Sequence, residues 1–202
     1  YCLAGIYCVA NLFLQFGVGF QNNKDGYSNI KQQARQFNVI FHTLVSRLNF
    51  NNFKAIGHSN GGLIYTVFLE NYFDQYSNDV RMTKLMTIGS PFNFNERSID
   101  NKTQMLSDFI KNRNKLPNNL TVYSVAGTKN YTSDGLVPLV SVAAGRYVFQ
   151  GAVRHFTTIT VSGSNAQHSD LPENKQIVDL INRYILHSTR VPRARQNEPR
   201  LH

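Results

Sequence analysis

The sequence has few cysteines and few acidic residues, and each shortage limits the kinds of site and partner that the protein can have. Its two cysteines, Cys2 and Cys8, have no metal-ligating neighbours, so neither a zinc site nor a disulfide framework is predicted. Only 12 Asp and Glu stand against 21 Lys and Arg, which gives a net charge of +9. No nucleic-acid-binding motif accompanies this charge, so DNA and RNA are not expected partners. The charge could instead favour an anionic membrane or cell wall.

A convincing membrane span is also missing. Residues 1–20 are apolar and long enough to be considered as one. However, Asn11, Gln15 and three glycines interrupt the run, and no basic flank precedes it. Its second half, residues 16–20, suits a buried strand better. The sequence leaves the compartment open between the cell surface and the cytoplasm.

Length and composition predict one folded domain. The 202 residues are 42% hydrophobic and include 10 Tyr and 14 Phe, enough for a sizeable core. No internal repeat or long low-complexity tract is present. Residues 189–202 carry four arginines, two prolines and little apolar content. We therefore expect a domain over residues 1–188 and a disordered basic tail over 189–202.

The most informative motif is the pentapeptide Gly57-His58-Ser59-Asn60-Gly61. Residues 52–56 before it are predicted to form a strand, and residues 62–69 after it a helix. A strand, a tight turn carrying serine and a helix are typical of the nucleophile elbow of an α/β-hydrolase. The glycines leave room for the neighbouring strand and helix, and the helix N-terminus favours negative charge where an oxyanion would form.

A serine hydrolase of this fold also needs an acid and then a histidine, each after a later strand. Residues 120–126 are predicted to form a strand, and Asp134 lies in the loop that follows. Residues 156–161 are predicted as the next strand, followed by a loop that carries His168. A helix over 174–186 ends the domain, with one stripe of apolar residues.

Each candidate also has an ordinary interpretation. Asp134 could be a turn former before a glycine, and His168 a solvated loop residue. His58 is expected to pack or to line the substrate pocket, and His155 is a weaker candidate for the base than His168 because it begins a strand. The order serine, acid, histidine, each after a strand, favours the catalytic interpretation.

Strands alternate with helices along the whole chain. A long amphipathic helix is predicted over 28–48, a strand over 84–88 and a helix near 102–113. The pattern predicts an α/β fold with a mostly parallel sheet and helices on both faces. Residues 90–119 are a candidate small cap, and Phe92 within them a candidate wall of an apolar substrate pocket.

Several segments resemble a family of α/β-hydrolases of unknown substrate from Gram-positive bacteria, described as cell-surface hydrolases. The resemblance rests on residues 22–26, 57–62, 89–93, 133–138 and 168–174, and spans most of the chain. It implies Ser59 as nucleophile, Asp134 as acid and His168 as base. It also implies that the backbone N–H of Asn60 helps to form the oxyanion hole.

One part of the family pattern is absent. A His-Gly segment after an early strand usually supplies a second oxyanion donor, and nothing before Ser59 contains it. We therefore expect a domain that lacks its N-terminal strands, with one oxyanion donor instead of two.

These observations predict a serine hydrolase that cleaves a small carboxylic ester and is esterase- or lipase-like. No metal or organic cofactor is expected, and the oligomeric state is left open. A thioesterase or amidase with the same triad is an alternative, and so is a catalytically weak, hydrolase-like binding domain.

Overall fold

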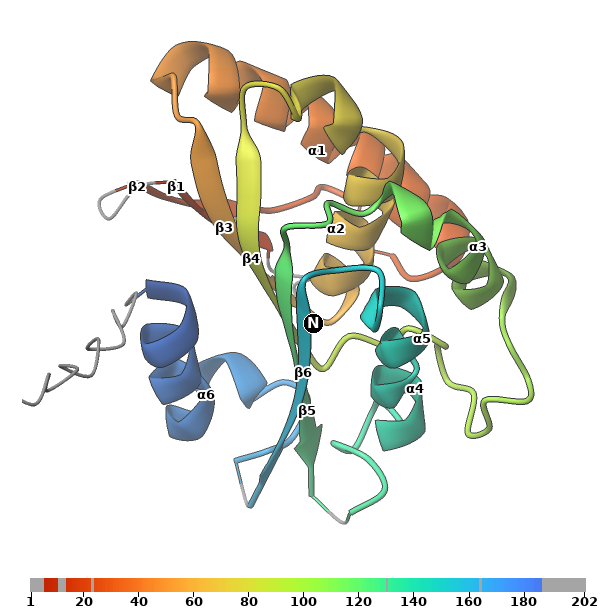
Figure 1. Cartoon of the computed structure of the whole chain (residues 1–202). Helices are drawn as coiled ribbons and strands as arrows, with labels where there is room; N and C mark the ends of the chain where they lie inside the picture. The colour runs from red at the N-terminus through yellow and green to blue at the C-terminus, as the bar shows by residue number, and fades with distance from the viewer. Residues whose placement is uncertain (1–5, 11–13, 23, 130, 164, 187–202) are drawn as a thin grey trace, which may run out of the picture.

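The computed structural model describes residues 6–10, 14–22, 24–129, 131–163 and 165–186. As predicted, the chain forms an α/β-hydrolase-type sheet with helices on both faces (Figure 1). The six strands lie in the order β2-β1-β3-β4-β5-β6. Their bounds are Ile6–Ala10 (β1), Leu14–Val18 (β2), Asn52–His58 (β3), Arg81–Ile88 (β4), Thr121–Thr128 (β5) and His155–Ser162 (β6). The helices are Tyr27–Leu48 (α1), Asn60–Asn71 (α2), Gln104–Asn112 (α3), Leu139–Ala143 (α4), Gly145–Phe149 (α5) and Lys175–Leu180 (α6).

Strands β3 to β6 run parallel, so their carboxyl ends meet at one edge of the sheet. The loops that carry the predicted serine, acid and histidine lie at that edge. All four strands were predicted, with observed bounds one to three residues wider at some ends. The parallel register places the predicted residues on neighbouring strand ends, which is the usual position of ligand sites in such sheets.

The N-terminal part of the sheet differs from the rest. Strand β1 pairs antiparallel with both β2 and β3, and the β1–β2 hairpin therefore covers the free edge of β3. The expectation of a buried strand over residues 16–20 is wrong. Leu14–Val18 forms an edge strand, in which the half-buried Phe16 and Val18 alternate with the exposed Gly17. The predicted tail over 189–202 lies outside the described residues.

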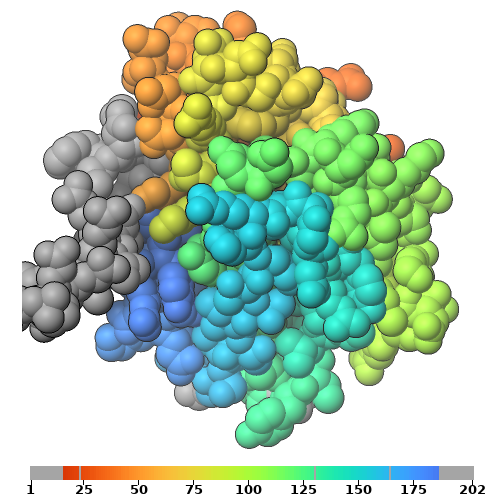
Figure 2. Space-filling model, viewed as in Figure 1, coloured from red at the N-terminus to blue at the C-terminus, as the bar shows by residue number. Residues whose placement is uncertain are grey.

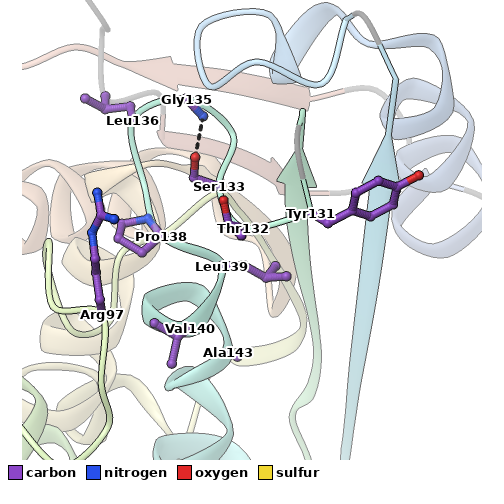
Figure 3. A pocket seen from close by; sticks show the side chains of 10 residues that line it. All are labelled: Arg97, Tyr131, Thr132, Ser133, Gly135, Leu136, Pro138, Leu139, Val140 and Ala143. Atoms are coloured by element: carbon purple, nitrogen blue, oxygen red, sulfur yellow. Dashed lines mark hydrogen bonds between the residues drawn. The ribbon is translucent and has the colours of Figure 1, made fainter.

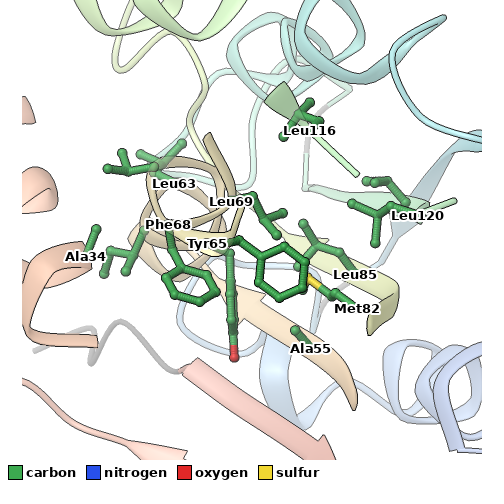
Figure 4. Packing of buried hydrophobic residues seen from close by; sticks show 14 of the residues in the cluster. Ala34, Ala55, Leu63, Tyr65, Phe68, Leu69, Met82, Leu85, Leu116 and Leu120 are labelled. Atoms are coloured by element: carbon green, nitrogen blue, oxygen red, sulfur yellow. The ribbon is translucent and has the colours of Figure 1, made fainter. Parts of the chain in front are cut away.

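Helices α1 and α2 form the main core on one face of the sheet. As predicted, α1 buries one stripe, in which Phe37 and Phe41 are fully enclosed. Phe37 meets Phe68 of α2 edge-on, with ring centroids 4.9 Å apart. Figure 4 shows Phe68 and its neighbours on α2 packed toward Ala55 of β3 and Leu85 of β4. Helix α2 is therefore fixed on both sides, and with it the turn that precedes it.

The opposite face is covered by α6 and a π-helical segment, Ile181–Leu186, that continues it. The side chain of Asn174 caps the helix start by accepting from the backbone N–H groups of Gln176 and Ile177. At the helix end, the Lys54 ammonium donates to the Ile185 carbonyl and the Lys84 ammonium to the Tyr184 carbonyl, both at 2.6 Å. Positive charge at a helix C-terminus is favourable. Burial lowers the pKa of both lysines.

The candidate cap segment packs on the flank of the helical layer. Helix α3 contacts α2 and α5, and its Phe109 meets Phe92 and Tyr27 edge-on. Thr103 caps its N-terminus through the N–H of Leu106. The short helices α4 and α5 were not predicted. The domain boundaries proposed above remain a prediction.

A carboxyl group is buried where α1, α2 and α3 meet. Glu70 of α2 is only 4% exposed, and its Oε1 has no hydrogen-bond partner among the described residues. Burial raises the pKa of Glu70 to about 9, with Asp108 adding to the rise and Lys115 opposing it. Glu70 lines a cavity of about 800 Å³ beside the amino ends of β4 and β5. This cavity is at the opposite end of the sheet from Ser59.

The strand β6 forms the second edge of the sheet and lies at the surface. Figure 2 shows it between the C-terminal helical segment and the segment of α4 and α5. Its side chains Thr157, Thr158 and Thr160 are exposed, which keeps this edge polar. Within the part of the chain that the structure describes, no helix is both long and apolar enough to cross a membrane.

Candidate active site

Ser59 lies at the sharp turn between β3 and α2. Its backbone has φ 54° and ψ −125°, a conformation that non-glycine residues rarely adopt, so the turn is strained. The Ser59 N–H donates to the Ile88 carbonyl of β4 at 2.8 Å, which ties the turn to the neighbouring strand. The serine side chain stays half-exposed at the carboxyl edge of the sheet. This is the geometry predicted for a nucleophile elbow.

The glycines around Ser59 are required by close backbone contacts. A Cβ atom on Gly57 would lie 2.5 Å from the Gly62 nitrogen and 2.6 Å from the Gly61 carbonyl carbon. A Cβ atom on Gly62 would lie 2.2 Å from the Ser90 hydroxyl. Helix α2 can therefore start directly against β3 and β4 only because these positions lack side chains.

His168 reaches Ser59 from the loop after β6. Its Nε2 lies 2.9 Å from the Ser59 hydroxyl, and its Nδ1 lies 2.7 Å from Oδ2 of Asp134. A carboxylate can only accept, so this pattern assigns the ring proton to Nδ1 and leaves Nε2 to accept from the serine. His168 is 3% exposed. The structure thus brings together the three residues predicted from the sequence.

Asp134 is held by the backbone of its own turn. The N–H groups of Leu136 and Val137 donate to its Oδ1 at 3.0 and 2.7 Å, while Oδ2 faces His168. The side chain is 1% exposed, so its hydrogen bonds replace water. The His168 N–H also donates to the Asp134 carbonyl at 2.9 Å. Backbone and side-chain contacts therefore both join the acid loop to the base loop.

His58 lies beneath His168. Its Nε2 is 3.0 Å from the His168 carbonyl oxygen, and the two rings are 5.0 Å apart. A carbonyl oxygen accepts, so Nε2 of His58 is the donor. Gly89 leaves room on another side, because a Cβ atom there would lie 3.2 Å from Nδ1 of His168. His58 is buried, and its ring contacts the loop that carries the base, so its predicted place in the pocket wall stays a prediction.

Asn60 begins α2, so its backbone N–H belongs to the first turn, where helical partners are missing. Its side chain donates to Oδ1 of Asp25 at 2.6 Å. Asp25 is on the loop before α1, which is attached to that helix through Asn29 and Gln33. The loop therefore lies beside the predicted oxyanion position. The expected absence of a second backbone donor in the oxyanion hole stays a prediction, because the structure does not describe residues 1–5, 11–13 and 23.

Phe92, the other predicted substrate contact, is placed in the core. It is fully buried, with its ring edge-on to Phe149 at 5.4 Å and against Gly145. It lines neither of the two cavities described here. The expected role as a pocket wall gains no support from this position.

Three features of the site were missed by sequence reasoning. They are the contact of Asp25 with Asn60, the support of His168 by His58, and the two backbone donors on Asp134. Only the third had a signal, since Asp-Gly is a turn former whose side chain often accepts from the next N–H groups. Among the described residues, no group of three or more His, Cys, Asp or Glu could hold a metal ion.

Comparisons with known proteins agree with the fold. A family model described as an alpha/beta hydrolase of unknown function matches residues 15–188. No curated protein matches the chain. Two similar solved structures come from Lactobacillus plantarum and Listeria innocua, and this chain covers about three quarters of each.

The first is a "putative cell surface hydrolase" from Lactobacillus plantarum, with 50% identity and a TM-score of 0.76, covering 86% of this chain and 74% of its own. The second is the product of gene lin2722 from Listeria innocua, with 26% identity and a TM-score of 0.75. That match covers 85% of this chain and 72% of the other.

Proposed function

Because the chain belongs to this family of α/β-hydrolases of unknown function, we propose that it is a serine hydrolase that cleaves carboxylic esters through an acyl-enzyme. The observation that carries the proposal is the contact chain from Ser59 through His168 to Asp134, with distances of 2.9 and 2.7 Å. Such an arrangement activates a hydroxyl that is otherwise a weak nucleophile.

The chemistry proceeds in two steps. The Ser59 hydroxyl attacks the ester carbonyl while Nε2 of His168 takes its proton, and the leaving alcohol receives that proton as the C–O bond breaks. Water then attacks the acyl-enzyme, again with His168 as base, and releases the acid and free Ser59. Asp134 keeps the proton on Nδ1 and stabilises the imidazolium that forms.

Negative charge on the carbonyl oxygen develops beside the start of α2. The backbone N–H of Asn60 is a donor for this oxyanion, and the positive end of the helix adds to its effect. The strained backbone of Ser59 directs its side chain to the exposed edge, where a substrate can reach it. Thioester and amide hydrolysis would use the same groups, and measured rates on matched substrates separate them.

Labelling with a fluorophosphonate probe tests the proposal, since the probe modifies only an activated serine. We expect labelling and hydrolysis of p-nitrophenyl butyrate by the native chain, and neither by Ser59→Ala. Circular dichroism and thermal denaturation of the variant check that the fold is kept. An unlabelled native chain, or a Ser59→Ala variant that keeps near-native turnover, would rule out the proposed nucleophile and favour a binding domain.

A further inference from the structure

The cavity that contains Glu70 is separate from the candidate active site. Its volume is about 800 Å³, and it lies beside the amino ends of β4 and β5, at the opposite end of the sheet from Ser59. Its lining comes from the last turn of α2, the 3₁₀ segment Phe73–Tyr76, the start of β4 and residues 114–119. Small-molecule sites usually have volumes of about 300–1,000 Å³, so this space is large enough for a compact organic ligand.

A buried polar group without a partner distinguishes this cavity from the other one. The cavity of about 740 Å³ lies along the acid loop and α4 (Figure 3). Its side chains are exposed or half-buried, and the Ser133 hydroxyl there accepts from the Gly135 N–H at 3.2 Å. Among the described residues that line it, none has a buried polar atom without a hydrogen-bond partner, whereas Glu70 has one in Oε1. The chain itself thus leaves a polar group unsatisfied in the Glu70 cavity.

The Glu70 carboxyl group has no cation as a partner. Its side chain is 4% exposed, yet it makes no ion pair among the described residues. Lys115 attracts it only from a distance, and the lysine side chain is exposed. Asp108 of α3 repels it, and the Asp108 oxygens accept from the Tyr27 hydroxyl of α1 and the Gln104 amide. Because buried carboxylates are normally paired, this carboxyl group fits a positive group that a ligand would bring.

The end of α2 also favours a positive charge. Glu70 and Asn71 are its last two residues, and its last turn contains no basic residue. The carbonyl groups at a helix C-terminus carry partial negative charge, which attracts cations. A carboxyl group at this place adds to that negative charge instead of balancing it. A ligand ammonium group in the cavity would lie close to both the carboxyl group and the helix end.

Amide groups form another part of the lining. Asn114, Asn118 and Asn119 line the cavity and are exposed, and the structure gives their side chains no hydrogen bond among the described residues. An amide group both donates and accepts, so it can pair with a hydroxyl group in either direction. Asp74 and Arg81 add one charge of each sign, both at exposed positions. This lining matches a ligand that carries several hydroxyl groups beside its ammonium group.

We propose that the Glu70 cavity binds an amino sugar, with its ammonium group on the Glu70 carboxylate and its hydroxyl groups on the asparagine amides. The carboxyl group releases its proton when the ligand binds, and the carboxylate then accepts hydrogen bonds from the ammonium group. The site lies at the opposite end of the sheet from Ser59, so the proposal does not depend on the proposed hydrolase activity.

Isothermal titration with D-glucosamine and D-glucose tests the proposal. The two sugars differ at one ring carbon, where glucosamine carries an ammonium group and glucose a hydroxyl group. We expect the native chain to bind glucosamine at least about tenfold more tightly, which is the size of one hydrogen-bonded contact to a charged group. The buffer is phosphate, because a primary amine buffer would compete for the carboxylate. Equal affinities for the two sugars, or no binding of glucosamine, would overturn the proposal.

Glu70→Gln should weaken the binding of glucosamine about tenfold or more and leave the affinity for glucose unchanged. Unfolding would not explain this loss, because the substitution removes a buried ionisable group and should stabilise the fold at neutral pH. Glu173→Gln is the matched control, since it makes the same replacement at an exposed position after β6, at the other end of the sheet. An equal loss in both variants would show a general charge effect and count against the cavity assignment.

Proton release separates an ion pair from a neutral hydrogen bond. Burial raises the pKa of Glu70 to about 9, so the free chain holds this proton at about pH 6.5, where glucosamine is an ammonium ion. Binding should therefore release about one proton, which titrations in phosphate and in MES measure because their ionisation enthalpies differ. Ser59→Ala should release the same proton. Binding of glucosamine without proton release would mean that Glu70 stays protonated, and the proposed ion pair would be wrong.

Discussion

Replacing Glu70 by glutamine should stabilise the fold at neutral pH. The carboxyl group is buried between helices, its Oε1 has no hydrogen-bond partner among the described residues, and burial raises its pKa to about 9. In the unfolded chain the group ionises near its ordinary value of 4.5. At pH 7 the folded chain must therefore keep a proton that the unfolded chain releases.

The sign and size follow from proton linkage. The Glu70 contribution to stability is fully present below pH 4.5, falls as pH rises, and is constant again above pH 9. Each pH unit within this window lowers the free energy of unfolding by about 1.4 kcal/mol. The native carboxyl group therefore costs about 3 kcal/mol at pH 7, which a neutral amide of the same shape avoids.

Urea denaturation followed by circular dichroism at several pH values measures this effect. The difference in unfolding free energy between Glu70→Gln and the native chain should grow by about 3 kcal/mol between pH 5.5 and pH 7.5. Asp74→Asn is the control, because Asp74 lines the same cavity but is exposed. If the unfolding free energies of the native chain and Glu70→Gln changed in parallel with pH, the reasoning would be refuted. Fluorophosphonate labelling of Ser59 should be the same in both proteins, because Glu70 lies far from the candidate active site.

Two further predictions concern the site itself. Asp134→Asn should lower kcat on p-nitrophenyl butyrate by about 10³–10⁴, because an amide no longer fixes the proton on Nδ1 of His168; a loss below tenfold would contradict the role of the acid. Gly57→Ala should destabilise the fold by about 1–3 kcal/mol in thermal or urea denaturation, because its Cβ would lie 2.5 Å from the Gly62 nitrogen. Gly19→Ala, with no atom within 4 Å of the added Cβ, is the control, and equal stability of the two variants would count against the crowded turn.

Much of the fold could be predicted because local pattern and tertiary packing agree. The stripe along residues 28–48 predicted the buried face of α1, and the β-branched runs predicted β5 and β6. The elbow was predictable because a serine between glycines after a strand has few other uses. Order along the chain predicted that Asp134 and His168 would lie near Ser59, since parallel strands bring their carboxyl ends together, and the structure places them there; their catalytic roles stay predictions.

Most of the remaining features depend on contacts that the sequence does not encode locally, and one had a local signal. Residues 16–20 were expected to form a buried strand, yet Phe16, Val18 and Phe20 alternate with two glycines. That alternation is typical of a half-buried edge strand. The contact of Asp25 with Asn60 joins loops 35 residues apart and has no sequence signature. Helices α4 and α5 have five residues each, too few for a clear period.

Lys54 and Lys84 hold the C-terminal end of the helical segment 175–186, and this affects when activity can arise during synthesis of the chain. Ser59 is made 109 residues before His168, so a growing chain carries the nucleophile long before its base. The base loop lies between β6 and the helix that the two lysines hold at its end. A chain that has not yet folded this part would thus expose a serine without a proton acceptor, and the hydrolase proposed here would become reactive only when the helix after the base loop docks.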